Sequence, residues 1–280
     1  MRKSILAAIC AVCLLITGCG GGENAPKPKE NAKIGVITHL NASELEYNEL
    51  MSKLEKSYRP SKANLAATYK YFNRMSEMQL ALESEQIDIL STYQSVADYM
   101  LQNSSDKELL PTNKNLSDSF CFAVRKGDTM LKNDLNKAIK EMTNDGTLIK
   151  LSKQYIIEIK GGTEPPAVEI SEIEGADTIK VAVTGDLPPF DMILADGTPA
   201  GFSTAVLAEV SRRINKNIEL VSVDSAARAS ILSSKGADVV FWVAVPKEST
   251  LIPANIDQPA GIIISDPYYN DTIAHIGLKK

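Results

Sequence analysis

The second half of the chain, residues 178–269, repeats one cycle of apolar and polar positions. Three apolar runs of strand length stand at 179–184, 218–223 and 239–243. Between them, apolar residues at helical spacing predict one helix over 202–214, and a shorter helix is predicted over 226–235. Strands that alternate with helices in this way are typical of parallel βαβ units, which bind ligands at the carboxyl ends of their strands. The pattern therefore predicts an α/β fold with a ligand-binding cleft.

The first half of the chain follows the same plan less regularly. Strands are predicted at 34–38, 66–72, 87–91 and 120–125, with helices at 75–84 and 131–142 and a last helix that ends near Tyr155. A further helix is predicted to begin at Ser43-Glu44-Leu45-Glu46, because this sequence has the form of a capping box. Both halves are therefore expected to be α/β units of similar design.

Four motifs of the second half carry a resemblance to a known family. They are Pro188-Pro189-Phe190, then Asp196-Gly197 followed by Gly201-Phe202, then Gly236-Ala237-Asp238, and finally Ser265-Asp266-Pro267-Tyr268-Tyr269. In their order and spacing they resemble the first lobe of the bacterial extracellular solute-binding protein family 3. The first half resembles the second lobe of that family, through Lys33-Ile34-Gly35-Val36, Ile87-Asp88-Ile89-Leu90, the stretch 122–128 and Asp145-Gly146-Thr147.

The resemblance implies a type II periplasmic binding-protein fold. In that fold each of two lobes is a mainly parallel sheet flanked by helices, and two hinge strands join the lobes. In the family the first lobe comes first, whereas here it comes last, and we interpret the chain as a circular permutant. The alternative interpretation is a fragment of a tandem array whose outer lobes are missing. The permutant predicts that residues 120–125 and 272–278 run side by side as the two hinge strands.

This interpretation divides the chain into seven segments. They are a leader at 1–18, a flexible tether at 19–32, a lobe at 33–119, a return hinge strand with closing helices at 120–159, a permutation linker at 160–177, a second lobe at 178–269 and a final hinge strand at 270–280.

The N-terminus has the form of a secretory leader. Basic Arg2 and Lys3 precede an apolar run at 5–17, which is too short to span a bilayer as a finished helix. The sequence Leu15-Ile16-Thr17-Gly18-Cys19 resembles a lipobox, so Cys19 is expected to carry palmitate and other acyl chains and to anchor the protein on the extracytoplasmic face of the cell membrane. The alternative is an ordinary signal peptide that happens to hold a cysteine. Cys121 then remains the only cysteine of the folded part, and we expect it to be a buried, inert side chain.

Charge and composition narrow the partners. The chain has 30 basic and 35 acidic residues, interspersed and without a basic run, so nucleic acid is not an expected partner. Its two histidines lack acidic or cysteine neighbours at ligand spacing, so we expect no metal, and no cofactor is predicted. The expected partners of this monomer are a small polar ligand, ABC permease subunits and the membrane.

The resemblance also implies how a ligand is held. In the family, an Arg binds the carboxylate of an amino acid and an Asp binds its ammonium group. This chain departs from that pattern: Trp242 and Val243 stand at the serine positions, Thr250 stands near the Arg position and Tyr93 replaces the Asp. Amino-acid recognition in the family's usual mode is therefore not expected.

Other residues are candidates for a rebuilt site. Trp242 and Phe190 would stack on a ligand or, alternatively, pack in the core; Tyr93 offers a hydroxyl and a ring. Arg228 would supply a cation, the alternative being a solvated surface arginine. The remaining candidates surround the predicted helix start, which suits an anion: Thr38, His39, Asn41 and Ser43.

Three function classes follow. The leading hypothesis is a solute-binding lipoprotein of an ABC importer, with amino acids as the ligand class that the family implies. The alternative is a binding module that senses a ligand or partner without transport. An enzyme is not expected, because no carboxylate pair, Ser/His/Asp set or phosphate loop stands out.

Overall fold

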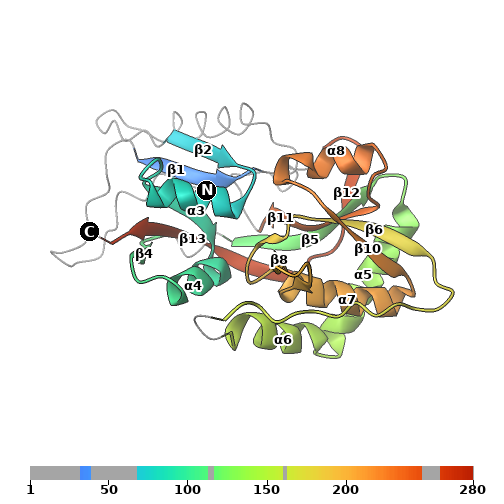
Figure 1. Ribbon diagram of the computed structural model, residues 1–280. Coiled ribbons are helices and arrows are strands. Elements are labelled where there is room, and N and C mark those ends of the chain that lie inside the picture. Colours follow the sequence, from blue (N-terminus) through green and yellow to red (C-terminus); the bar gives the residue numbers. More distant parts are fainter. Residues whose placement is uncertain (1–31, 39–67, 113–116, 160–162, 248–258, 280) are drawn as a thin grey trace, which may run out of the picture.

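A computed structural model describes residues 32–38, 68–112, 117–159, 163–247 and 259–279. The chain forms two lobes around one continuous ten-stranded sheet (Figure 1). The N-lobe contains β1 (Lys33–Ile37), β2 (Thr68–Phe72), α3 (Met75–Glu83), β3 (Ile89–Tyr93), α4 (Gln94–Gln102) and β4 (Lys107–Leu110).

The C-lobe contains the rest of the chain except for its last strand. It begins with β5 (Ser117–Arg125), α5 (Thr129–Asn144), α6 (Thr147–Ser152) and the π-helical turn η1 (Lys153–Ile157). After the linker it continues with β6 (Thr178–Val183), α7 (Phe202–Ile214), β10 (Asn217–Ser222), η2 (Ser225–Ala227), α8 (Arg228–Ser233), β11 (Val239–Pro246) and β12 (Ile262–Ile264). A small antiparallel sheet, β7 (Asp186–Leu187), β8 (Asp191–Ile193) and β9 (Pro199–Ala200), follows β6.

Two antiparallel strands join the lobes. In the sheet order β10-β6-β11-β5-β13-β3-β1-β2, the central pair is β5 and β13 (Tyr269–Leu278). Tyr269 pairs with Phe120 and Thr272 with Ser117, after which β13 leaves β5 and pairs with β3 and β4 of the N-lobe. The two predicted hinge strands are therefore neighbours, but they pair through 117–120 and 269–272. The predicted segments themselves diverge, because 121–125 pairs with β11 and β12 and 273–278 pairs with β3 and β4.

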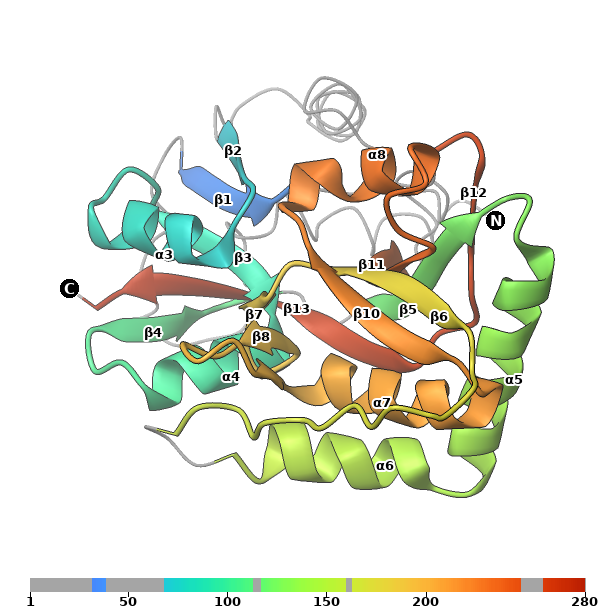
Figure 2. The same cartoon turned by 45° about the vertical axis from the view of Figure 1, so that its right-hand side comes forward.

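The parallel pairing predicted within each lobe is confirmed. In the C-lobe β6 lies between β10 and β11 and is parallel to both, and in the N-lobe β1 is parallel to β2 and β3. Side chains alternate across the C-lobe sheet: Val181 and Val239 face the main core with α7, whereas Ala182 and Val240 face Leu232 of α8. Helices accordingly cover both faces of this sheet (Figure 2).

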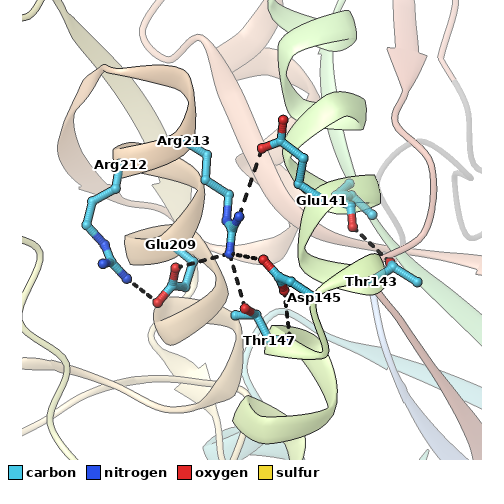
Figure 3. A network of polar contacts seen from close by, with 8 residues as sticks. Glu141, Thr143, Asp145, Thr147, Glu209, Arg212 and Arg213 are labelled. Atoms are coloured by element: carbon cyan, nitrogen blue, oxygen red, sulfur yellow. Dashed lines mark hydrogen bonds and ion pairs between the residues drawn. The ribbon is translucent and has the colours of Figure 1, made fainter.

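An ion-pair network connects helices α5 and α6 to α7 (Figure 3). Nη2 of Arg213 on α7 lies 2.9 Å from Oδ2 of Asp145 and 3.1 Å from Oγ1 of Thr147, at the junction of α5 and α6. Its guanidinium also lies 3.9 Å from Glu141 and 3.7 Å from Glu209. These contacts place the helices that follow β5 on the C-lobe.

Several elements were not predicted. Helix α4 and the short strands β4 and β12 stand where no element was expected, and the segment after β6 forms the small β7–β8–β9 sheet rather than a simple break. The predicted helix start at residue 43 and the lipidation site at Cys19 lie outside the described residues. No helix in the described part of the chain is long and apolar enough to cross a membrane.

Candidate functional site

The carboxyl ends of strands from both lobes meet beside the hinge. Thr184 follows β6, Trp242 lies on β11, Thr38 follows β1 and Tyr93 ends β3. Arg228, at the start of α8, links the two lobes because its Nη2 donates to the Thr38 carbonyl oxygen at 3.3 Å. The structure therefore forms a polar and aromatic cluster where parallel sheets bind ligands.

Trp242 owes its position to a bulge in β11. The pairing register between β11 and β5 shifts between Val240 and Val243, and Trp242 has a φ of 49°. A side chain in this left-handed region is strained by roughly 1–2 kcal/mol, and bulges re-aim side chains next to functional sites. The bulge turns the indole toward the C-lobe interior, where its Nε1 donates to Oδ2 of Asp191 at 3.0 Å and to Oγ1 of Thr184 at 3.2 Å.

Asp191 is a buried carboxylate held by several donors. Its Oδ2 accepts hydrogen bonds from the backbone N–H groups of Thr184 at 2.9 Å and Gly185 at 3.0 Å, and from Oγ1 of Thr184 at 2.8 Å. Burial raises the pKa of this carboxyl above its ordinary value, and the hydrogen bonds oppose the rise. Asp191 therefore orients Trp242 from within the C-lobe and is shielded from a ligand.

The guanidinium of Arg228 lies over the indole ring of Trp242. Its guanidinium carbon is 4.3 Å from the centroid of the indole ring, the geometry of a cation–π contact. Nη1 donates to the Trp242 carbonyl oxygen at 3.2 Å and Nε to that of Ser225 at 3.3 Å. Only 3% of this residue is exposed, so the alternative interpretation as a solvated surface arginine is wrong. These carbonyl partners fix the orientation of the guanidinium against the indole ring.

Aromatic rings fill the space between the lobes. Phe120 of β5 stacks on Phe190 with ring centroids 4.7 Å apart. Tyr93 of the N-lobe meets Phe120 edge-on at 4.8 Å, and Tyr269 of β13 lies 5.5 Å from Phe190. Phe190 is fully buried, so in this arrangement it packs in the core against the two hinge strands and does not face an open cleft.

The predicted site residues divide into three groups. Arg228, Trp242, Thr38, Tyr93 and Phe190 come together at the lobe interface, as described above. Val243 does not join them, because its side chain packs with Ala123, Val240 and Leu232 on the other face of the sheet. The structure therefore corrects its assignment as a ligand residue. His39, Asn41 and Ser43 lie outside the described residues.

Sequence reasoning missed Asp191 and Thr184. An aspartate beside the Pro-Pro-Phe break resembles a solvated turn residue, and nothing in the sequence around it predicts that Trp242 would reach it. The available signal was the polar Thr184 at the carboxyl end of an apolar strand, a position that commonly contributes to sites in parallel sheets.

Two other titratable residues, Cys121 and His275, are buried in the hinge strands. Cys121 is buried in β5, and burial raises the pKa of its thiol to about 12, which agrees with the expected inert side chain. His275 is buried in β13. Among the residues that the structure describes, no group of three or more His, Cys, Asp or Glu side chains could hold a metal ion.

Comparison with known proteins identifies one family model. The model of the bacterial extracellular solute-binding proteins, family 3, matches residues 60–158 and 179–248, which is more than half of the chain. No curated protein matches the chain.

Solved structures of similar architecture have low sequence identity to this chain. A ligand-binding core of GluR0 in complex with L-glutamate is 11% identical, with a TM-score of 0.37 over 90% of this chain and 86% of that one. A ligand-binding component of an ABC-type import system from Staphylococcus aureus, with zinc bound, is 13% identical, with a TM-score of 0.44 over 89% and 66%. The oxidized form of OxyR is 10% identical, with a TM-score of 0.40 over 88% and 85%.

Proposed function

The chain belongs to the bacterial extracellular solute-binding proteins, family 3, and on that premise we propose that it is the membrane-anchored solute receptor of an ABC importer. The family makes it a binding module for small ligands with a type II periplasmic binding-protein fold. Membership of a non-catalytic family agrees with the expectation that it is not an enzyme. The ligand class, the transport role and the lipid anchor are parts of the proposal.

The observation that carries the proposal is the position of Arg228 between the lobes. Its Nη2 hydrogen bond to the Thr38 carbonyl oxygen crosses from the C-lobe to the N-lobe. When the lobes open, this bond breaks and the donor becomes available to an acceptor on a ligand. A guanidinium fixed on an indole ring suits a carboxylate, because its planar donors match both carboxylate oxygens. We therefore assign the ligand to small solutes with a carboxylate, amino acids included.

Ligand binding is tested by a thermal-shift screen of the soluble protein that begins at Gly20. Amino acids, short peptides, amines and other carboxylates are the probes. A ligand at about a hundred times its Kd stabilises the folded state by roughly 2.7 kcal/mol, which is a readily measured shift. We expect stabilisation by a carboxylate-bearing probe and none by the amine that lacks the carboxylate.

Variants show whether Arg228 makes the contact. Arg228→Met should abolish the shift, and Arg228→Lys, which keeps the charge but loses the planar donors, should weaken it. Arg212→Met is the matched control, since Arg212 is an exposed arginine of α7 that pairs only with Glu209 among the described contacts. Retention of the full shift in folded Arg228→Met would contradict the assignment. Silence of the wild-type protein across all probes would favour a module that binds a partner protein.

The anchor is tested separately. Cells that make the full chain are labelled with palmitate, and their membranes are separated from soluble proteins. We expect label in the membrane-bound protein and its loss in Cys19→Ala, because acyl chains supply the hydrophobic attachment. Equal membrane association of the unlabelled variant would contradict lipid anchoring.

A further inference from the structure

The start of helix α3 in the N-lobe contacts the C-lobe directly. Oδ2 of Asp186, on β7, accepts hydrogen bonds from Oγ of Ser76 at 3.0 Å and from the backbone N–H of Ser76 at 3.3 Å. An aspartate of one lobe thus occupies the first turn of a helix of the other lobe, where a negative charge is stabilised by the free N–H groups and the helix dipole.

A second acidic residue reinforces this contact. Nε of Arg74, the residue before α3, lies 2.9 Å from Oδ1 of Asp224 in the C-lobe. The next residue, Ser225, donates its backbone N–H to the Asn73 carbonyl oxygen at 3.4 Å. The segment 73–76 therefore meets the C-lobe at two separate places, β7 and the start of η2.

The contacts have the chemistry of a reversible latch. Both pairs reach solvent: Arg74 is 46% exposed and Asp224 is 54% exposed, and in the other pair Ser76 is exposed and Asp186 is half-buried. Exposed ion pairs are weak and are screened by salt, so they bias an equilibrium between two arrangements without locking it. The four side chains of these pairs lie outside the proposed ligand site, although Oγ1 of Thr38 in that site donates to Oδ1 of Asn73 at 3.1 Å.

We propose that Asp186 and Asp224 latch the first turn of α3 and hold the two lobes closed in the absence of ligand. The consequence is that a ligand has to enter from a minor open state, and its apparent Kd increases as the population of that state falls. The latch goes beyond the proposed function and does not depend on the identity of the ligand.

The closed state is measured by the distance between spin labels on the two lobes of the soluble, ligand-free protein. Leu80→Cys on α3 and Ser233→Cys on α8 place labels on exposed positions of opposite lobes. The buried Cys121 is expected to stay unlabelled. We expect one short distance population in low salt, and a growing long-distance population as the salt concentration is raised.

Variants assign the effect to the latch. Asp186→Ala with Asp224→Ala should raise the open-to-closed ratio roughly tenfold, which corresponds to about 1.4 kcal/mol. Asp186→Asn with Asp224→Asn, which keeps acceptor oxygens but removes the charges, should raise it less. Asp177→Ala with Asp196→Ala is the control, because neither carboxylate crosses between the lobes in its described contacts.

The proposal would be overturned if the folded double variant Asp186→Ala with Asp224→Ala kept the short distance of the wild type. It would also be overturned if the wild-type protein at low salt showed the same broad distance distribution as that double variant. Either result is independent of the ligand screen, because no ligand is present. A failed screen with an intact latch would contradict the proposed function alone.

Discussion

At the scale of single residues, the buried polar contacts of Trp242 determine whether the candidate site keeps its shape. Trp242→Phe preserves a ring but removes the Nε1 donor to Asp191 and Thr184. We expect a loss of about 1–3 kcal/mol in the free energy of unfolding, because a buried carboxylate loses a hydrogen-bond donor. Urea denaturation followed by circular dichroism measures it.

A double-mutant cycle separates that contact from the lost packing. In an Asp191→Ala background the substitution Trp242→Phe should cost less, since the carboxylate acceptor is already absent and only Oγ1 of Thr184 remains. Equal costs in both backgrounds would show that the indole contributes only by filling space.

His275 provides a second prediction, which concerns pH. Its side chain is buried in β13, Nδ1 has no hydrogen-bond partner among the described residues, and burial lowers its pKa from 6.5 to about 4. The unfolded chain therefore binds a proton below about pH 6.5 that the folded protein does not bind. Stability from this group is complete above that pH and falls by about 3 kcal/mol as the pH drops to about 4.

Comparison with a variant isolates this histidine from the carboxylates that titrate in the same range. His275→Gln should reduce the loss of unfolding free energy that occurs between pH 7 and pH 4. The variant His39→Gln measures how much of that loss comes from the other histidine. Parallel curves for the wild type and His275→Gln would refute a buried neutral imidazole.

At the scale of elements, the Arg213 network connects α7 to the junction of α5 and α6 (Figure 3). Arg213→Met leaves Glu141, Asp145 and Glu209 close together without their shared cation. We expect a loss of about 1–2 kcal/mol in unfolding free energy at low salt, since a network on a partly buried arginine exceeds the small contribution of one exposed pair. Arg212→Met, which removes one exposed pair, should cost less than about 0.5 kcal/mol. Equal effects of the two variants would contradict a role of the network.

Elements with a regular apolar face were predictable from the sequence, and elements defined by tertiary contacts were not. Helix α7 was predicted with its observed bounds because Phe202, Val206 and Val210 all face the core. Strand β4 was missed because it starts at Lys107, a charged residue that is buried through contacts with Glu83, Asp106 and Ser104. The ion pair with Glu83 is one that no local pattern predicts. Helix α4 has few large apolar residues and starts directly from a strand.

The same distinction applies to the site. Trp242 and Arg228 were recognisable because of where they stand in the strand–helix–strand pattern. Their partnership was not, because it depends on a bulge in β11 and on the approach of Thr38 from the other lobe. Interactions between residues that are far apart in the chain decide which candidates meet.

At the scale of the whole molecule, the strand order makes the interpretation as a permutant testable. Strand β13 is antiparallel to β3, and β1 is parallel to β3. The last residues of β13 and the first residues of β1 therefore lie at the same end of the strands of the N-lobe sheet. Ile276 pairs with Leu90, which pairs in turn with Gly35. Because β3 lies between them, β13 and β1 are separated by two strand spacings of about 4.8 Å. A linker of four to six residues spans this gap of about 10 Å.

We therefore expect that a rearranged chain folds as well as the natural order. It would start at Thr163, run to Leu278, continue through a Gly/Ser linker into Lys33 and end at Ile159, which gives the lobe order that the resemblance assigns to the family. Apart from the terminal contacts of Ala32 and Lys279, the described contacts within the lobes are kept. Loop-closure entropy changes only slowly with loop length, so the unfolding free energy should stay within about 1–2 kcal/mol of the parent. Urea unfolding and the spin-label distance between the lobes measure this.

A matched chain opened inside α7, between Glu209 and Val210, should fail to fold because it interrupts a core helix. Failure of the rearranged chain alongside that control would show that the natural connection through 160–177 is needed for folding, and the interpretation as a permutant would lose its physical basis.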